Sequence, residues 1–293
     1  MNKIFHFFKF AFSTNILKRF LGICSFLITI FSFIIIFFPL KTDSYDYSTL
    51  GAILFILTII ILFIFTAIFY KKKRKIILKI NQSKIIIRCG DIFNQNNFSE
   101  KTYRVIGVNE YFDTHLGDGV IDEATLHGQY LQKYYTSDIS DLDERITNGI
   151  SRSEIAAALD NNERAYNKVI KYRLGTTFLD KKTNIILVAL THFDDNNNAK
   201  IMTRDLMLCY AHMWDNLLKL KQANSIAIPL LGAGTTTQMN PVMSYQQILE
   251  ALLITFKFSN MQFKHPASLQ IIISENVIKE INLLEIKDRY SED

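Results

Sequence analysis

The first 75 residues contain two long runs without a charged side chain. Residues 20–40 and 50–70 consist mainly of Phe, Leu and Ile, with a few small or hydroxyl residues among them. Each run has about 21 residues, which is the length that crosses roughly 30 Å of hydrocarbon as a helix. The sequence therefore predicts two transmembrane helices at the start of the chain.

The charges around these runs predict their orientation. Residues 1–19 and 71–75 carry only basic charges, whereas the linker 41–49 has one Lys against two Asp. The positive-inside rule then places both ends of the hairpin in the cytoplasm. The alternative is a buried helical hairpin of a soluble protein, which the full bilayer length of both runs disfavours.

The rest of the chain is mildly acidic. Of the 33 basic and 28 acidic residues, ten and two fall within residues 1–75, which leaves 23 and 26 for residues 76–293. Such a body offers no basic face for a phosphate backbone, so no nucleic-acid partner is expected. Cys24, Cys89 and Cys209 lack paired spacing, which indicates neither a disulfide framework nor a metal site.

Residues 76–293 alternate short β-branched runs with amphipathic segments, which is typical of an α/β domain. The sequence predicts a hairpin over 76–80 and 84–88, and strands over 103–109, 184–190, 225–231 and 269–274. It predicts helices over 122–135, 151–171, 204–221, 244–256 and 276–287, and solvated loops at 137–144 and 194–198. Ser244 and Gln247 have the spacing of a capping box.

Two loops that contain glycine pairs follow predicted strands. One is 228–237, with Gly232 and Gly234, and the other is 108–122, with Gly117 and Gly119. Backbone amides in such loops converge on anions, and open α/β sheets bind ligands beyond the carboxyl ends of their strands. A plain strand-to-helix turn is the alternative at each loop. Neither fits the P-loop or dinucleotide fingerprint, so ATPase and dehydrogenase functions lose support.

Four short motifs stand in the order of the landmarks of a macro domain. They are Gly90-Asp-Ile92, Val108-Asn109, Gly119-Val-Ile-Asp-Glu-Ala124 and Ser225-Ile-Ala-Ile-Pro-Leu-Leu-Gly-Ala-Gly234. From about residue 75 to residue 288 the chain therefore resembles a macro domain. The resemblance implies a three-layer α/β/α domain with a mixed six-stranded sheet over residues 76–293, which binds an ADP-ribose derivative and needs no cofactor or metal.

The resemblance also implies roles for particular residues. They are Asp91 with Ile92 at the adenine, Gly119, Val120, Ile121, Gly232, Ala233, Gly234, Thr235 and Thr236 around the diphosphate, and Asn109 with Asp113 at the distal ribose. Backbone donors suit phosphate oxygens, and a carboxylate suits an exocyclic amine. Asp91 also has the alternative of a turn aspartate, and the hydroxyl run 235–237 that of a helix cap.

The chain departs from the macro-domain pattern at the distal end. Many macro domains carry a second asparagine three residues after the first, linked to ADP-ribose hydrolysis, and Phe112 stands at that position. Thr236 stands where an aromatic residue is expected. These departures predict a rebuilt distal pocket and no enzymatic activity. Asp113, Asp118, Asp122 and Glu123 form an acidic patch. It performs acid–base work, recognises a cationic part of the ligand, or is a set of solvated loop charges.

Two spans joined to a divergent macro domain resemble the ThsA effectors of Thoeris antiphage defence. The resemblance implies a multi-pass protein of the bacterial inner membrane with a cytoplasmic C-terminal domain. It further implies that this domain senses an ADP-ribose-derived signal, histidine–ADP-ribose made by a TIR-domain partner, and that binding leads to oligomerisation or membrane disruption and abortive infection. A homo-oligomer is expected because neither span has an ionisable residue with which one copy could line a pore. The alternatives are a membrane-anchored ADP-ribosyl hydrolase and a non-catalytic membrane scaffold.

Overall fold

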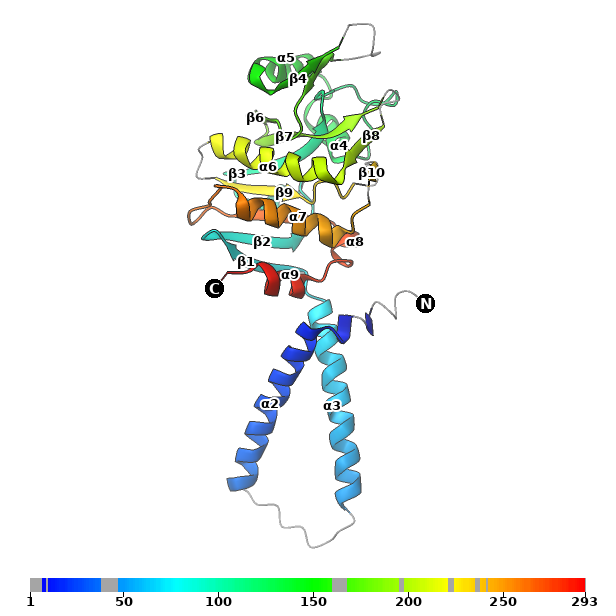
Figure 1. Ribbon diagram of the computed structural model, residues 1–293, viewed down its shortest axis with the longest axis vertical. Helices are drawn as coiled ribbons and strands as arrows, with labels where there is room; N and C mark the ends of the chain where they lie inside the picture. The colour runs from blue at the N-terminus through cyan, green and yellow to red at the C-terminus, as the bar shows by residue number, and fades with distance from the viewer. Residues whose placement is uncertain are drawn as a thin grey trace. The chain divides into compact units, whose positions relative to one another are not determined.

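The chain divides into two units in the computed structural model. The structure describes residues 7–8, 10–37, 47–159, 168–194, 198–220, 224–234, 238–240 and 242–292. The first unit comprises Met1–Arg74 and Asn282–Arg289, and the second comprises Lys75–Ile281 and Tyr290–Asp293 (Figure 1). The last helix of the chain therefore belongs to the same unit as its first helices.

The first unit is built on two long helices, α2 (Thr14–Phe37) and α3 (Tyr47–Lys71). Large apolar side chains on both are exposed, with Phe26 and Ile61 each at 66%. Within the described residues, no helix has both the length and the hydropathy needed to span a bilayer. The spans expected over 20–40 and 50–70 remain a prediction, and residues 38–46 of the intervening segment lie outside the described residues.

Helix α9 (Leu283–Tyr290) packs near the N-terminal end of α2 and the C-terminal end of α3. Leu284 joins Ala11, Ile16 and Ala67 in a buried cluster. Nearby, an Arg19 guanidinium nitrogen lies 3.2 Å from a carboxylate oxygen of Asp288. Both contacts join residues more than 200 positions apart in the chain, and neither was indicated by the sequence.

The second unit is built on a mixed sheet. Its strands are β1 (Lys75–Ile80), β2 (Ser83–Cys89), β3 (Thr102–Asn109), β6 (Thr177–Asp180), β7 (Ile185–Phe193), β8 (Ala199–Met202), β9 (Ser225–Pro229), β10 (Gln238–Asn240) and β11 (Leu269–Ile273). Their order in the described chain is β1-β2-β11-β9-β3-β7-β8-β10, and β6 pairs with β7. Strands β2, β11, β9, β3 and β7 are parallel. Strand β1 is antiparallel to β2, β6 and β8 are antiparallel to β7, and β10 is parallel to β8.

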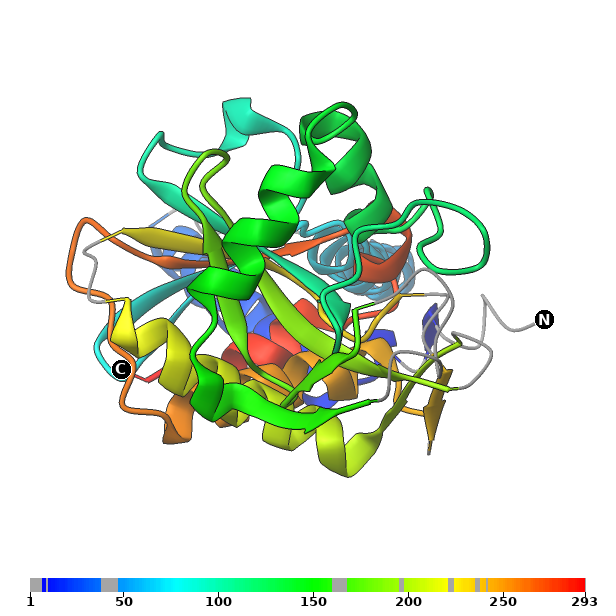
Figure 2. The same ribbon diagram turned by 90° about the horizontal axis from the view of Figure 1, so that it is seen from above.

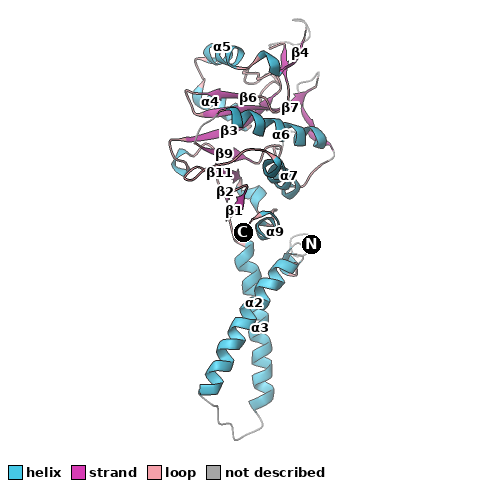
Figure 3. Ribbon diagram, turned by 60° about the vertical axis from the view of Figure 1, so that its left-hand side comes forward, coloured by secondary structure: helices cyan, strands magenta, loops and turns pink. Residues whose placement is uncertain are grey.

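Helices cover both faces of this sheet, as Figures 2 and 3 show. Helices α4 (Leu126–Tyr134) and α5 (Ile139–Gly149) pack on one face, where Tyr130 and Leu142 share a core with Ile106 and Leu187. Helices α6 (Thr203–Lys219) and α7 (Tyr245–Phe258) cover the other, where the ring of Trp214 meets that of Phe256 edge to face. The predicted α/β fold with a mixed sheet is confirmed. The sheet has nine strands in the described chain rather than six, because β6, β8 and β10 are too short to show a pattern.

The helix predicted over 151–171 is wrong. A 3-10 turn at Arg152–Glu154 leads into β4 (Ile155–Ala158), which pairs antiparallel with β5 (Ile170–Tyr172). Residues 160–167 lie outside the described part. Backbone bonds from the Tyr172 amide to the Glu110 carbonyl and from the Arg173 amide to the Glu154 carbonyl, each 2.9 Å, hold this extended arrangement. Tertiary pairing thus outweighs the helix propensity of an alanine-rich stretch.

Three other element boundaries differ from the sequence prediction, and one cap agrees with it. The predicted loop 137–144 lies largely in α5, because Leu142 and Ile146 are buried against the core. The helix predicted over 276–287 is two helices, α8 (Glu275–Ile278) and α9, because the Asn282 side chain accepts the Glu285 amide and starts a new helix. The helix predicted from residue 122 begins at Leu126. The capping box at Ser244 and Gln247 is confirmed.

A buried carboxylate ties α4 and α5 to the turn after β6. Asp180 has no exposed surface and accepts hydrogen bonds from the Tyr130 and Tyr135 hydroxyls at 2.9 and 2.6 Å and from Arg145 at 2.6 Å. The Thr183 hydroxyl donates to the same carboxylate at 2.5 Å. Burial raises the pKa of Asp180, but the hydrogen bonds outweigh it, so the pKa stays below its usual value.

Asp180→Ala is expected to lower the free energy of unfolding by about 3–5 kcal/mol, because it removes the acceptor of two buried phenols and the buried carboxylate that pairs with Arg145. Denaturant unfolding of the detergent-solubilised chain, followed by the fluorescence of its single tryptophan, Trp214, measures this. Asp138→Ala is the control, since that carboxylate is 59% exposed and lies 3.8 Å from Lys182. Equal effects of the two substitutions would contradict a structural role for Asp180.

Candidate functional site

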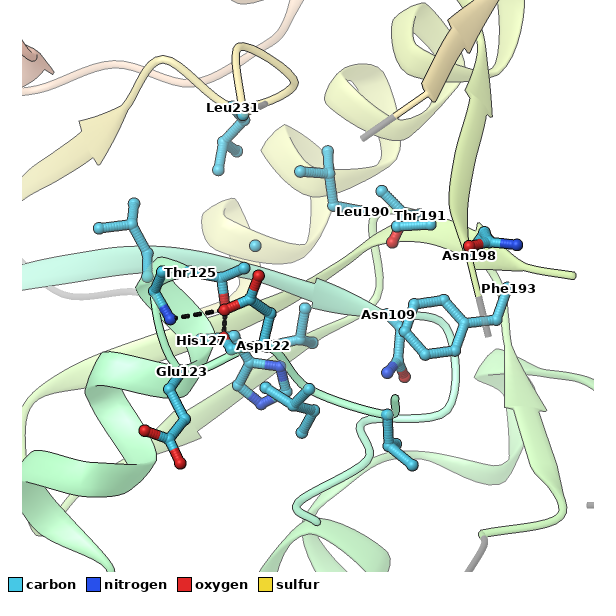
Figure 4. Close-up of a pocket in the computed structure, with 18 of the residues that line it drawn as sticks. Asn109, Asp122, Glu123, Thr125, His127, Leu190, Thr191, Phe193, Asn198 and Leu231 are labelled. Atoms are coloured by element: carbon cyan, nitrogen blue, oxygen red, sulfur yellow. Dashed lines mark hydrogen bonds between the residues drawn. The ribbon is translucent and has the colours of Figure 1, made fainter. Parts of the chain in front are cut away.

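A cavity of about 830 Å³ lies at the carboxyl ends of β3, β7 and β9. Strand β3 pairs in parallel with both β7 and β9, so the three ends meet at one edge of the sheet. The loop 117–125 before α4, His127 of α4 and the start of β8 complete the walls (Figure 4). The volume is typical of pockets that hold small molecules.

The loop before α4 is shaped by two glycines. Gly117 and Gly119 have φ angles of +79° and +75°, in the left-handed region that favours glycine. The Val120 amide donates to the Gly117 carbonyl at 2.9 Å, and the Gly117 amide donates to the Ile121 carbonyl at 3.0 Å. The Gly119 amide has no acceptor among the described residues. The Gly119 amide is therefore an available donor at the cavity wall, whereas the Val120 amide is already hydrogen-bonded within the loop.

The opposite wall is the loop after β9. Gly232 has a φ of +81°, and the Ala233 amide donates to the Leu230 carbonyl at 3.1 Å. Within the described ranges, the amides of Gly232 and Gly234 donate to no protein acceptor. Gly119, Val120, Ile121, Gly232 and Gly234 all line the cavity. Thr235 and Thr236, for which the sequence predicts phosphate contacts, lie outside the described residues.

Asn109 lines the cavity, but its side chain is engaged by its own loop. The carboxamide oxygen accepts the amides of Tyr111 and Asp113 at 3.0 and 3.3 Å, and the carboxamide nitrogen donates to the Asp113 carboxylate at 3.1 Å. Phe112 is fully buried, and its ring meets that of Tyr172 edge to face at 5.4 Å. The position of the second macro-domain asparagine thus belongs to the core.

Asp113 lines a second hollow of about 490 Å³ and does not line the principal cavity. The same hollow includes Lys168, whose ammonium donates to the Phe112 carbonyl and pairs with Asp143, both at 2.6 Å. Burial lowers the pKa of Lys168, and the Asp143 carboxylate opposes that shift. The structure therefore separates Asp113 from most of the residues that the resemblance groups with it.

The predicted adenine contacts do not line the principal cavity either. Asp91 is exposed, and its carboxylate accepts the Phe93 amide at 2.8 Å, which is the hydrogen bond of an Asx turn. Ile92 is buried in the core beneath it. As it stands, the Asp91 carboxylate serves the local turn, which is the alternative that the sequence left open.

Several cavity residues were not predicted from the sequence. Thr191 and Phe193 end β7, and Leu231 follows β9. The rule that ligands bind beyond strand ends points to such positions. Asp122 and Glu123 also line the cavity, and the Asp122 carboxylate accepts the Ala124 amide at 2.8 Å.

His127 is the least expected residue of the cavity wall. It lies in the first turn of α4, is 6% exposed, and has a buried Nε2 atom for which the described residues supply no hydrogen-bond partner. Burial, followed by the charge of Lys168, lowers the pKa of His127 to about 3. Its imidazole is therefore neutral at physiological pH. A histidine just after a glycine loop is the signal that the sequence offers for it.

The cavity wall carries no cation within the described residues. Its charged residues are Asp122 and Glu123. The groups of the wall that suit an anion are backbone amides and the N-terminus of α4, whose first turn is capped by the Thr125 hydroxyl. Across the described ranges, no group of three or more His, Cys, Asp or Glu side chains is arranged to hold a metal ion. The arrangement suits an anion that is recognised by direction rather than by charge.

The sequence relatives identify the family of this chain. Residues 85–274 match the family described as Thoeris protein ThsA, Macro domain. The Thoeris protein ThsA of Bacillus amyloliquefaciens (strain Y2) is 34% identical over 217 residues, which cover 73% of this chain and 70% of that protein. The chain therefore belongs to the macro-domain family of Thoeris ThsA proteins.

Solved macrodomains are also similar to this chain. A point-mutant form of the Oceanobacillus iheyensis macrodomain has 16% sequence identity, covers 74% of this chain and 97% of its own length, and has a TM-score of 0.42. The same macrodomain with ADP has 13% identity, covers 74% of this chain and 95% of its own, and has a TM-score of 0.37.

His127 is expected to make stability depend on pH. Its pKa is about 3 in the fold, against about 6.5 in the unfolded chain, so between these values the unfolded chain binds a proton that the folded chain does not. Stability is then complete above pH 6.5 and falls as the pH drops, by about 2 kcal/mol between pH 7 and pH 5. His127→Leu should remove this dependence in denaturant unfolding followed at Trp214.

His115→Asn is the matched control, because the His115 side chain is 39% exposed and pairs with Asp118 at 3.0 Å. That variant should keep the pH dependence of the parent chain. An unchanged dependence in the His127 variant would contradict a buried neutral imidazole.

Proposed function

We propose that this protein is a membrane-anchored effector of bacterial antiphage defence that senses an ADP-ribose-derived nucleotide in the cavity beyond β3, β7 and β9. One observation carries the proposal. The amides of Gly119 on one wall and of Gly232 and Gly234 on the other have no acceptor within the described residues. Such a pair of walls suits the two phosphates of a diphosphate. Membership of the Thoeris ThsA family supports the biological setting.

The proposed role is binding without catalysis. The Asn109 side chain uses its oxygen and one of its donors within its own loop, and Phe112 contributes its side chain to the core. Among the described cavity residues, Asp122 and Glu123 are the carboxylates available for proton transfer, and His127 is neutral and buried. No observation favours the alternative of an ADP-ribosyl hydrolase, so the sensor is the function that we infer.

The ligand that we propose is histidine–ADP-ribose, made by a TIR-domain partner. In this proposal the oxygens of its diphosphate accept hydrogen bonds from the glycine amides, and its amino-acid group needs polar partners near the distal ribose. Asp122 and Glu123 on the cavity wall supply carboxylates that suit a cationic group. The family to which this chain belongs supports a signal of this type.

The membrane part of the proposal rests on the sequence. The uncharged runs 20–40 and 50–70 have bilayer length, and basic residues flank both on the side that we assign to the cytoplasm. Exposed Phe26 and Ile61 on α2 and α3 fit an apolar surrounding. We propose a multi-pass protein of the inner membrane with a cytoplasmic C-terminal domain. Because neither run has an ionisable residue, several copies act together when the membrane is disrupted.

Gly232→Glu is expected to remove nucleotide binding, because it places a carboxylate and a strained backbone at the phosphate wall. Titration calorimetry of the detergent-solubilised chain with ADP-ribose and histidine–ADP-ribose measures this, with a loss of at least about tenfold in affinity expected. Gln82→Glu is the control, since it adds the same charge at a turn that lies outside the cavity. Absence of heat for the parent chain with either ligand would count against the proposed sensor.

Ligand binding is expected to increase the leakage of dye from proteoliposomes that hold the full chain. Binding shifts an equilibrium only by its different affinity for two states, so the leakage should follow saturation of the cavity. The Gly232→Glu chain should show no ligand-dependent leakage at the same protein density. Leakage that is equal with and without histidine–ADP-ribose would contradict the gating step, and release of ADP-ribose from the ligand would favour the hydrolase instead.

A further inference from the structure

The outer face of the β1–β2 hairpin is basic, although residues 76–293 as a whole carry more acidic than basic side chains. Exposure alternates along β1, so that Lys75, Ile77 and Lys79 point to one face while Ile76, Leu78 and Ile80 are buried. Residues 76–293 as a whole hold 23 basic and 26 acidic side chains. A face rich in cations on such a body calls for an explanation beyond solubility.

The register of the hairpin completes this face. Lys75 lies opposite Arg88, Ile77 opposite Ile86, and Lys79 opposite Lys84, and paired residues point to the same side of a sheet. The basic hairpin face therefore consists of Lys75, Lys79, Lys84 and Arg88 around a central pair, Ile77 and Ile86. Like charges opposite one another oppose folding, and Lys79 and Lys84 are such a pair. The register thus concentrates positive charge on this face.

Two lysines of this face have no acidic partner among the described residues, and the partners of Arg88 are uncharged. Lys75 and Lys84 are exposed and form no ion pair with any residue that the structure describes. Arg88 donates to the side-chain oxygen of Gln270 and the carbonyl of Asn97, and its guanidinium lies over the ring of Phe98 at 5.1 Å. These partners are uncharged, so Arg88 keeps its full charge on the face.

We propose that the basic hairpin face binds the anionic headgroups of phospholipids, an inference that rests on the proposed membrane anchoring. The tether supports it, because β1 starts at Lys75, four residues after α3 ends at Lys71, a distance of at most about 14 Å. Residues 71–75 are themselves all basic. Anionic leaflets attract basic segments close to a membrane anchor.

The apolar centre distinguishes a lipid surface from a soluble anion. Ile77 is 46% exposed although it lies in the middle of a strand, and Ile86 opposite is half-buried. A soluble phosphate uses the lysines and leaves this pair in water. A bilayer interface takes up both, because aliphatic side chains enter the headgroup region while lysine ammonium groups stay among the phosphates.

The test places a fluorescent reporter at the centre of the face. Ile77→Trp is made in the full chain, which is reconstituted into vesicles of phosphatidylcholine alone or mixed with phosphatidylglycerol, each with brominated acyl chains. The bromines quench only a tryptophan that reaches the interface. The unmodified chain supplies the background, since its single tryptophan, Trp214, is fully buried. Quenching beyond that background is expected only with phosphatidylglycerol, and it should be lost in concentrated salt.

Charge reversal of the lysines gives the second arm. Lys75→Glu with Lys84→Glu is expected to abolish the quenching of the Ile77→Trp reporter. Lys181→Glu with Lys264→Glu, at exposed positions outside the face, is expected to leave it unchanged. The salt dependence of the reporter chain without charge reversal keeps the test valid if the double variant fails to fold.

The outcomes separate this inference from the proposed function. Equal quenching in both lipids, or none above background in a chain that floats with the vesicles, overturns the lipid contact and leaves the membrane anchor intact. A chain that does not float with either vesicle overturns the anchor and the contact together. Quenching that depends on phosphatidylglycerol, on low salt and on Lys75 and Lys84 supports the contact.

Discussion

Parallel pairing of β3 with β7 on one side and with β9 on the other is the constraint on which the cavity depends. It brings the carboxyl ends of three strands to one edge, although β9 lies more than 100 residues from β3 in the sequence. The loops that leave these ends must then face one another. A diphosphate needs donors from two directions at fixed separation, and a rigid sheet supplies that separation better than a mobile loop does. The position of Gly119 opposite Gly232 thus follows from strand order.

The sequence predicted the parts of the fold that carry their own periodic signal. Apolar runs such as 184–190 identified the central strands, and the glycines at 117, 119, 232 and 234 identified loops that line the cavity. It failed where long-range pairing decides the structure, as in β4 and β5, whose alanine-rich sequence favours a helix in isolation. The site followed the same division. Phe193 and His127 reach the cavity through strand register and helix position, which a strand end and a preceding glycine loop indicate only in part.

The distal end shows how small changes redirect a shared scaffold. Asn109 keeps its place at the end of β3, but hydrogen bonds to Tyr111 and Asp113 turn its carboxamide toward its own loop. Phe112 adopts a φ of +53°, which an aromatic residue tolerates only where packing requires it, and its ring fills the core beside Tyr172. The Asn109 carboxamide and the Phe112 ring thus both serve the local fold. The proposed ligand-binding function depends on the glycine loops before α4 and after β9, and it does not require a free Asn109 side chain.

The two proposed binding sites differ in how they would hold an anion, and their separation matters for the proposed mechanism. The cavity has no lysine or arginine among its described residues and relies on amides, whose directional bonds are little screened by salt inside a concave site. The basic hairpin face relies on lysines, whose attraction is long-ranged, non-specific and strongly screened. If the cavity were lined with lysines, anionic lipid and every cellular nucleotide would compete for it. In the proposed mechanism, separate surfaces control membrane proximity and signal recognition, so that the signal alone decides when the state of the protein changes.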